Sequence, residues 1–195
     1  MTPPPSPFAE FLPLSADELA ALTPYLRPVR HAAGAVIVRE GDPCREVLVM
    51  TEGLVRCFYD HRGRDVNLRL LCAPAAVVPF ASFVRQEPAT ETIEAVEPVA
   101  GLRLRLRDFA DEHPGALAER IGRVLAERHY LSMERRLRTL QWKSAKERYD
   151  YFCAHVEPAI VQRMPLYHVA SYLGVTPESL SRVRRARAQS RAGRT

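Results

Sequence analysis

Five polar side chains lie close together near the C-terminus, at spacings that leave hydrogen-bonding groups on the outer side of a helix. They are Glu178, Ser179, Ser181, Arg182 and Arg185. A guanidinium group can donate two parallel hydrogen bonds to a base edge or a phosphate, and hydroxyl and carboxylate groups complete the usual set of nucleic-acid contacts. The chemistry that these residues could do is therefore recognition of a polyanion, provided that a fixed helix presents them.

The preceding residues predict a first helix and a tight turn. An apolar face at helical spacing is formed by Val169, Ala170 and Leu173. Gly174 then ends the helix, because glycine readily adopts the left-handed conformation that a helix end requires. Thr176 follows as an N-cap residue whose hydroxyl can accept a hydrogen bond from the next helix.

The second helix is predicted to begin at Pro177, since proline is favoured at the first helical position. Leu180 and Val183 would point back at the first helix. The stretch from Leu166 to Arg185 therefore indicates a DNA-binding helix-turn-helix, in which Thr176 joins the five contact residues. An ordinary helical hairpin with a solvated arginine face is the alternative.

Positive charge is concentrated at the same end of the chain. The whole chain carries a formal net charge of +5, whereas the segment from Val161 to Thr195 alone carries +6, so residues 1–160 total −1. Such local basicity favours a polyanionic partner. We expect the end of the chain, Ala188 to Thr195, to be disordered, so that the arginines in the tail from Ser190 onward add affinity only as mobile charges.

Other classes of function find little support. The segment from Met1 to Pro7 has neither the basic region nor the apolar core of a signal peptide, and no stretch is apolar enough for a membrane span, so we expect a cytoplasmic protein. No catalytic combination of nucleophile, base and orienting group is visible, so we expect neither an enzyme nor a cofactor. The four cysteines have no metal-ligand or disulfide spacing and are expected to be free thiols: Cys44, Cys57, Cys72 and Cys153.

Short alternating runs follow a predicted helix from Ser15 to Leu26, and they indicate an antiparallel β-roll or jelly roll. Gly101 to Arg107 is the clearest strand, with leucines on one face and arginines on the other. The other runs begin at Val36, Glu46, Leu54, Asp65 and Thr90.

A long helix is predicted from Pro114 to about Trp142, because no proline interrupts this segment. One apolar stripe on it consists of Leu117, Ile121 and Val124, and a second consists of Tyr130, Met133, Leu137 and Leu140. Because a helix of roughly 25 residues would extend beyond a small roll, we expect a dimer contact that includes Leu117, Ile121 and Val124. Packing against the roll alone is the alternative.

This order of elements resembles the Crp/Fnr family of bacterial transcription regulators over nearly the whole chain. The residues that carry the resemblance are Gly34 to Asp42, Val47 to Arg56, the long helix and Leu166 to Arg185. The resemblance implies an α+β fold with a cyclic-nucleotide-binding-like β-roll (residues 1–113), a dimerisation helix (114–142) and a helix-turn-helix domain (143–195). It also implies double-stranded DNA, a second copy of the chain and RNA polymerase as partners.

The chain departs from the family at the cyclic-nucleotide site. Family members carry a Phe-Gly-Glu motif and a following arginine that neutralises the cyclic phosphate. Here Pro79 and Phe80 replace the Gly-Glu pair, and Thr90 or Glu91 stands at the place of the arginine. Because a buried phosphate without a cation is costly, we expect neither cyclic AMP nor cyclic GMP to bind. The region would instead hold an apolar ligand or be filled by its own side chains. Its candidate residues are Pro79, Phe80, Ala81, Ser82, Phe83, Thr90 and Thr92.

Two further departures concern the DNA-binding end and the choice of sensor. Pro177 stands where many members carry an arginine, and no alternating pattern near the helix-turn-helix predicts a β-hairpin wing. The clustered N-terminal cysteines that would bind an iron-sulfur centre are also missing. The sequence thus predicts a homodimeric transcription regulator with an unknown effector. The alternative is a small-molecule-binding or protein-interaction module whose helical end does not bind specific DNA.

Overall fold

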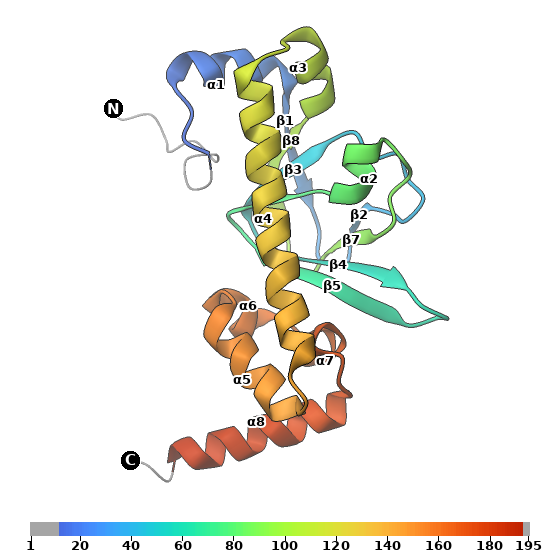
Figure 1. The fold of residues 1–195 in the computed structure, drawn as a ribbon, viewed down its shortest axis with the longest axis vertical. Helices are drawn as coiled ribbons and strands as arrows, with labels where there is room; N and C mark the ends of the chain where they lie inside the picture. The colour runs from blue at the N-terminus through green and yellow to red at the C-terminus, as the bar shows by residue number, and fades with distance from the viewer. Residues whose placement is uncertain (1–11, 193–195) are drawn as a thin grey trace.

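A computed structural model describes residues 12–192 of the chain. Two antiparallel sheets pack against each other beside the long helix α4 (Ala116–Gln141), and a group of helices lies at the far end of α4 (Figure 1). This is the α+β architecture that the sequence predicts, an antiparallel β-roll followed by a long helix and a helical region. The fold class is therefore confirmed.

The two sheets of the roll each contain four strands. The first has the order β1 (Leu26–His31), β8 (Val99–Leu104), β3 (Val47–Glu52) and β6 (Ala75–Val77). The second has the order β2 (Val36–Val38), β7 (Thr92–Ala95), β4 (Leu54–Asp60) and β5 (Asp65–Cys72). Alternating side chains of both sheets point inward and form one core, which includes Ile37, Met50, Val55, Cys57 and Ile93.

Two predicted boundaries in the roll are wrong. The helix expected to reach Leu26 ends at Leu22 as α1 (Ala16–Leu22), because Pro24 redirects the chain through the 3-10 turn η1 (Thr23–Tyr25) and Leu26 opens β1. The strand expected to reach Arg107 ends at Leu104, and α3 (Leu106–Glu112) begins two residues later. There Leu106 is buried in a helical packing position rather than in the sheet.

The first half of α4 packs on α1 and α3. Ile121 and Leu125 are buried in a core that these helices share with one sheet of the roll, and Leu22 and Phe109 belong to the same core. The second half of α4 continues past the roll to the helical region (Figure 1). The α4 helix therefore connects the β-roll with the helical region.

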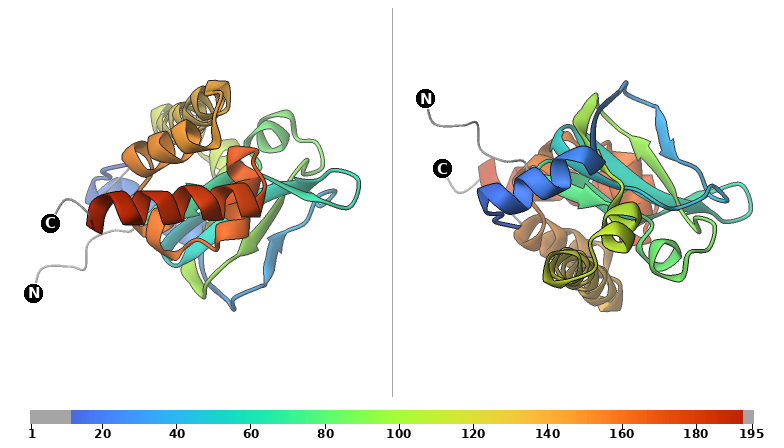
Figure 2. Two further views of the ribbon diagram at one scale, coloured as in Figure 1. Left: turned by 90° about the horizontal axis from the view of Figure 1, so that it is seen from below. Right: turned by 90° about the horizontal axis from the view of Figure 1, so that it is seen from above.

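The helical region consists of α5 (Ala145–His155), α6 (Pro158–Arg163), α7 (Leu166–Leu173) and α8 (Pro177–Ala192). Ser144 caps α5 by accepting a hydrogen bond from the Glu147 backbone N–H at 3.2 Å, and the Glu147 carboxylate accepts one from the Ser144 N–H. The sequence did not predict α6. Viewed from below, α8 lies across the end of the molecule (Figure 2, left).

Two expectations about the C-terminal end are also settled within the described range. Between residues 143 and 192 the structure contains helices and no strand, in agreement with the predicted lack of a wing. The disorder expected from Ala188 onward is wrong as far as Ala192, because α8 continues to that residue. Residues 193–195 lie outside the described part. Among the described helices, none combines the length and the apolar character that a membrane crossing needs.

Candidate nucleic-acid interface and ligand pocket

The turn between α7 and α8 has the geometry that the sequence predicts. Gly174 adopts a left-handed conformation with φ 64° and ψ 40°, and its N–H donates to the carbonyls of Ala170 and Ser171. Thr176 Oγ1 accepts a hydrogen bond from the backbone N–H of Ser179 at 3.2 Å and so caps the start of α8. The two helices are thus joined by a short turn whose backbone groups are paired.

An arginine that the sequence did not single out fixes this turn from α5. Arg148 Nη1 donates to the carbonyl of Leu173 at 2.9 Å and to that of Gly174 at 3.2 Å, and its Nε donates to the carbonyl of Trp142 at 2.8 Å. A Cβ at position 174 would lie 3.2 Å from the Arg148 guanidinium and 3.3 Å from Leu140. The left-handed backbone therefore favours a glycine there, and a Cβ would crowd the ends of these two side chains.

The inner and outer faces of α8 are separated as expected. Leu180 is fully buried against α7, and Val183 packs on the same apolar cluster. Glu178, Arg182 and Arg185 are exposed and stand four and three residues apart, which places them on one face of the helix. α8 itself lies at the end of the molecule opposite α1 and α3 (Figure 1).

The other predicted contact residues have local roles. Thr176 acts as the cap, and Ser179 and Ser181 are half-buried. Arg182 Nη2 lies 3.4 Å from Ser179 Oγ. In contrast, Arg187 faces inward, where its Nη1 donates to Asp150 at 3.0 Å, so that this arginine anchors α8 on α5.

The seven residues predicted to line a ligand pocket differ widely in exposure. Pro79, Ser82, Phe83 and Thr92 are buried, Phe80 is half-buried, and Ala81 and Thr90 are exposed. α2 (Phe80–Arg85) is tied to the following loop, because the Thr90 N–H donates to Ser82 Oγ at 3.1 Å. Phe83 packs in the core around α1 and α3. A hydrogen bond therefore joins α2 to the following loop, and Phe83 of this helix is part of the core.

A buried ion pair that the sequence did not reveal lies beside this loop. Arg69 on β5 and Glu91 are 4% and 6% exposed, and Arg69 Nη2 donates both to the Glu91 carboxylate and, at 2.8 Å, to the carbonyl of Val78. Burial in the same interior raises the pKa of the Cys57 thiol to about 12. The cation inside the roll is thus neutralised by the chain's own carboxylate.

A cavity of about 630 Å³ lies between the β5–β6 connection and α4. Its apolar wall includes Leu70, Val78, Phe80 and Leu131, and Phe80 stacks on the His129 ring with centroids 5.0 Å apart. Burial, with a smaller contribution from the charge of Arg69, lowers the pKa of His129 to about 4. Further lining residues are Arg69, Arg128, Ser132 and Arg135. Phe80 is the one predicted pocket residue among those that line this cavity.

The stripe of α4 that the sequence assigned to a dimer contact faces the chain's own core. Ile121 is 3% exposed, and Leu117 and Val124 pack against the same core. The second stripe is open instead, since the side chains of Tyr130 and Leu137 are 66% and 59% exposed.

Cysteines and histidines do not gather into a metal site anywhere in residues 12–192. The four cysteines are free thiols, with Cys44 and Cys57 buried and Cys72 and Cys153 half-buried. Burial raises the pKa of Cys44 to about 11.

Comparison with known proteins agrees with this geometry. The family model of the cyclic nucleotide-binding domain matches residues 28–112, which span the β-roll and α3. A curated relative, the acetyltransferase Pat of Mycolicibacterium smegmatis, is 29% identical over 113 residues, which is 56% of this chain. The match spans only 33% of the length of that relative.

Two solved structures resemble nearly the whole chain. FixK2 from Bradyrhizobium japonicum has a TM-score of 0.71 at 17% identity, with 85% of each chain covered. The c-di-GMP-responsive global regulator CLP of Xanthomonas campestris has a TM-score of 0.69 at 16% identity, with 90% of this chain and 93% of that chain covered. Residues 28–112 therefore match the family model of the cyclic nucleotide-binding domain, and the chain as a whole has the fold of the Crp/Fnr regulators.

Proposed function

We propose that this chain is a transcription regulator of the Crp/Fnr type, which binds a roughly palindromic DNA site as a homodimer in the cytoplasm. The observation that carries the proposal is the recognition face of α8, where Glu178, Arg182 and Arg185 are exposed on a helix anchored by Leu180. A helix held in this way can enter a major groove with its first turns against the base edges. No enzymatic activity is part of the proposal.

The distribution of charge supports a nucleic-acid partner. The net charge of +6 lies in residues 161–195, and Arg182, Arg184 and Arg185 are exposed on α8. Arginines outside the recognition face would contact phosphates and give an affinity that falls with salt concentration. Arg184 extends from α8 on a side different from that of Arg182, since two residues of helix correspond to a rotation of about 200°.

The second stripe of α4 supports a homodimer. Ala126, Tyr130, Met133, Leu137 and Leu140 alternate at spacings of four and three residues, the pattern with which two helices pack side by side. A Cβ at Gly122, one turn before this stripe, would meet no atom within 4 Å, so that a second helix has room to approach. The same helix in two copies would place two α8 helices at one end of a symmetric dimer.

The ion pair of Arg69 and Glu91 supports an effector other than a cyclic nucleotide. A cyclic phosphate needs a cation, but Arg69 is already paired with Glu91, and Arg85 on α2 is exposed near Glu87 at 3.8 Å. Displacing the Glu91 carboxylate would leave a buried charge unpaired. The cavity beside α4 has the volume of a small-molecule site. Its wall combines apolar side chains such as Leu131 with charged ones such as Arg128 and Arg135, so it favours an effector with both apolar and polar groups. RNA polymerase is the further partner that a regulator of this type implies.

The DNA part of the proposal is tested by selecting duplexes from a random pool with the purified chain and then titrating the selected site. Arg182→Ala should relax the preference at one base pair of each half-site, at a cost of about 1 to 3 kcal/mol on the cognate base. Arg184→Ala is the matched control, because it removes the same charge from the same helix but from another side. It should weaken binding to cognate and point-mutated duplexes alike.

An equal loss on every duplex for Arg182→Ala would contradict the assigned role of this residue. Failure of the wild-type chain to select any duplex, together with a salt-insensitive protein contact, would favour the protein-interaction module instead.

The effector part is tested by titrating cyclic AMP and cyclic GMP into the same protein in a calorimeter. At millimolar nucleotide we expect no saturable heat, because the internal cation is neutralised by Glu91. A micromolar dissociation constant for either nucleotide would overturn this part and leave the DNA result unaffected.

A further inference from the structure

The helix-turn-helix is attached to the β-roll by a set of hydrogen bonds between β5 and α7. The backbone N–H of Asn67 donates to Ser171 Oγ at 3.0 Å, and this hydroxyl donates to the carbonyl of Asp65 at 2.8 Å. Asn67 Nδ2 donates to the carbonyl of His168 at 3.1 Å. Asn67 is fully buried, so that α7 covers this part of the strand.

His168 adds a second polar contact at the same junction. Its ring is 5% exposed, and its Nδ1 lies 3.4 Å from both Arg56 Nη1 and Asn67 Nδ2. Because both neighbours are donors, Nδ1 must act as the acceptor of a neutral ring. Burial, and next the charge of Arg56, lowers the pKa of His168 to about 4, in agreement with a neutral ring.

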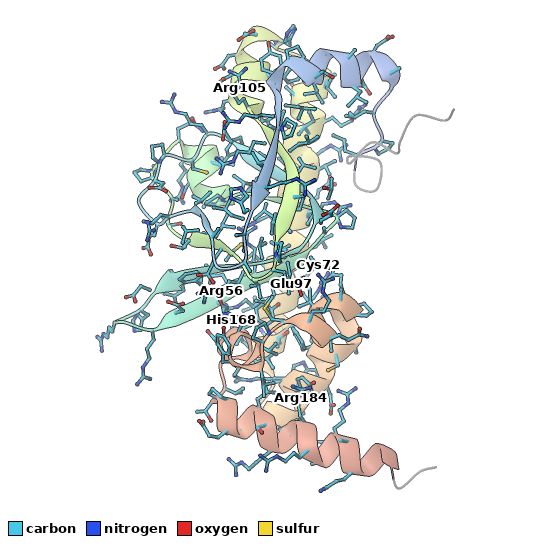
Figure 3. The ribbon with its side chains drawn as sticks, turned by 180° about the vertical axis from the view of Figure 1, so that it is seen from behind. Arg56, Cys72, Glu97, Arg105, His168 and Arg184 are labelled. Carbon is cyan, nitrogen blue, oxygen red and sulfur yellow. The ribbon has the colours of Figure 1, made fainter. Side chains whose placement is uncertain are left out.

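Arg56 is itself fixed on the sheet, so that the junction rests on a rigid base. Its guanidinium forms two hydrogen bonds with Glu94, at 3.0 and 3.1 Å, and an ion pair with Asp65 at 2.7 Å. Its Cζ also lies 3.8 Å from the centroid of the Phe58 ring. In Figure 3, Arg56 and His168 lie together at the boundary between the roll and the helical region.

A third attachment joins the roll to α6 rather than to α7. Arg163 at the end of α6 forms a two-bonded ion pair with Glu97, which lies in the turn between β7 and β8. Apolar packing adds to these attachments, because Leu54 and Leu70 of the roll belong to one cluster with Val169 and Leu173 of α7.

The recognition helix moves with α7, because the buried Leu180 packs α8 directly on that helix. An attachment of α7 to the roll at several points therefore fixes the direction of α8 relative to α4. Buried hydrogen bonds between defined partners specify one arrangement more narrowly than apolar packing does.

We propose that Arg56, Asn67, His168 and Ser171, with the Glu97–Arg163 pair, are positioning residues that set the spacing between the two DNA half-sites that the dimer accepts. The proposal rests on the proposed function. In a dimer joined through α4, two docked α8 helices have one separation and one tilt. Each base pair inserted between half-sites moves them apart by about 3.4 Å and rotates them by about 34°, so a fixed pair of helices accepts one spacing. Helix-turn-helix units that are not attached to the roll would instead bind sites with several half-site spacings.

The test uses the full-length chain with two surface changes combined. Ser171→Ala removes the hydroxyl that bridges β5 and α7, and Arg163→Ala removes the pair with Glu97, while both side chains are at least partly exposed, so that the fold should survive. Ser171→Thr keeps a hydroxyl and is the conservative variant. Thr51→Ala is the matched control, because it removes a comparable hydroxyl hydrogen bond, to the carbonyl of Ala100 at 3.2 Å, on the other sheet.

The measurement is affinity for the selected site and for versions with one or two base pairs inserted or deleted between the half-sites. For the wild type, Ser171→Thr and Thr51→Ala, a two-base-pair change should weaken binding by tenfold or more, about the cost of one or more mismatched base pairs. For the double variant the same change should weaken binding by less than about threefold, while base preference within each half-site stays as in the wild type.

Hydrogen exchange of the peptides that contain β5 and α7, measured without DNA, gives an independent readout. These segments should be protected in the wild type and exchange faster in the double variant, which must keep its circular dichroism spectrum. Equal exchange in both proteins would overturn the attachment itself. Faster exchange with an unchanged spacing profile would overturn the positioning role. If the wild type binds no duplex, the proposed function and the positioning role both fail, whereas the exchange result still judges the attachment.

Discussion

At the scale of single residues, the surroundings of the half-buried His129 and the buried His168 lower the pKa of each ring to about 4. Protonation of His168 would place a charge in a site that it shares with the Arg56 guanidinium, although Glu94 and Asp65 lie near enough to reduce the repulsion. Burial of the ring, and next the charge of Arg56, therefore lowers the pKa of His168 from 6.5 to about 4.

This shift makes stability depend on pH. Because the unfolded chain binds a proton at His168 near pH 6.5 and the folded chain only near pH 4, acid favours the unfolded state. The free energy of unfolding should be highest above pH 6.5 and should fall as the pH is lowered toward 4, as measured by urea denaturation at a series of pH values. His168→Gln should make this decrease shallower. An equal slope for the wild type and His168→Gln would show that this ring does not titrate as its surroundings imply.

The structural roles of the residues near the recognition face could be predicted, because the signals for caps, turns and helices depend on residues that are close in the sequence. Thr176, Gly174 and Leu180 have the places that their types and spacing indicate. The partners of Arg69 and Arg148 could not be predicted. A single sequence does not reveal which acid or carbonyl a distant arginine reaches, since that depends on how sheets and helices pack.

At the scale of elements, α4 was predictable as a helix, but its orientation about its own axis was not. Either of its two apolar stripes could pack on the core, and periodicity alone does not decide which stripe faces inward. Packing of α1 and α3 decides it in favour of Ile121 and leaves Tyr130 and Leu137 open.

The open stripe gives a direct prediction about association. Leu137→Asp places a charge in the proposed contact between two copies, where an unpaired buried charge costs several kcal/mol, and the variant should therefore sediment as a folded monomer. Ile121→Asp is the contrasting change, because it places the charge in the chain's own core and should reduce the helical circular dichroism signal and lower the melting temperature. A Leu137→Asp variant that remains a folded dimer would place the contact on another surface.

Some strands could likewise be predicted from the sequence, and others could not. Alternating runs predicted most of the roll, whereas β1 was missed because it carries Arg27, Pro28 and Arg30, which make it look like a loop. β1 lies at the edge of its sheet and pairs only with β8, where proline and charged residues are tolerated.

At the scale of the whole molecule, the order of roll, long helix and helical region follows from the sequence, but the attachment of the last part to the first does not. Asn67 and Ser171 are more than one hundred residues apart and have no periodic pattern that would relate them. Contacts of this kind form only when complete elements pack. The predicted boundary at residue 142 separates the roll and the long helix from the helices that follow. One apolar cluster, however, contains residues from both sides of this boundary.

The apolar cluster that includes Leu54, Leu70, Val169 and Leu173 limits how freely parts of this molecule could be exchanged with those of other proteins. A chimera that joins this helical region to a different sensor would leave the inner face of α7 without its partner surface. Exposed apolar area of that kind promotes aggregation. Recombination would therefore have to carry the outer surface of β4 and β5 together with the helix-turn-helix, so the transferable module comprises two separate segments of the chain.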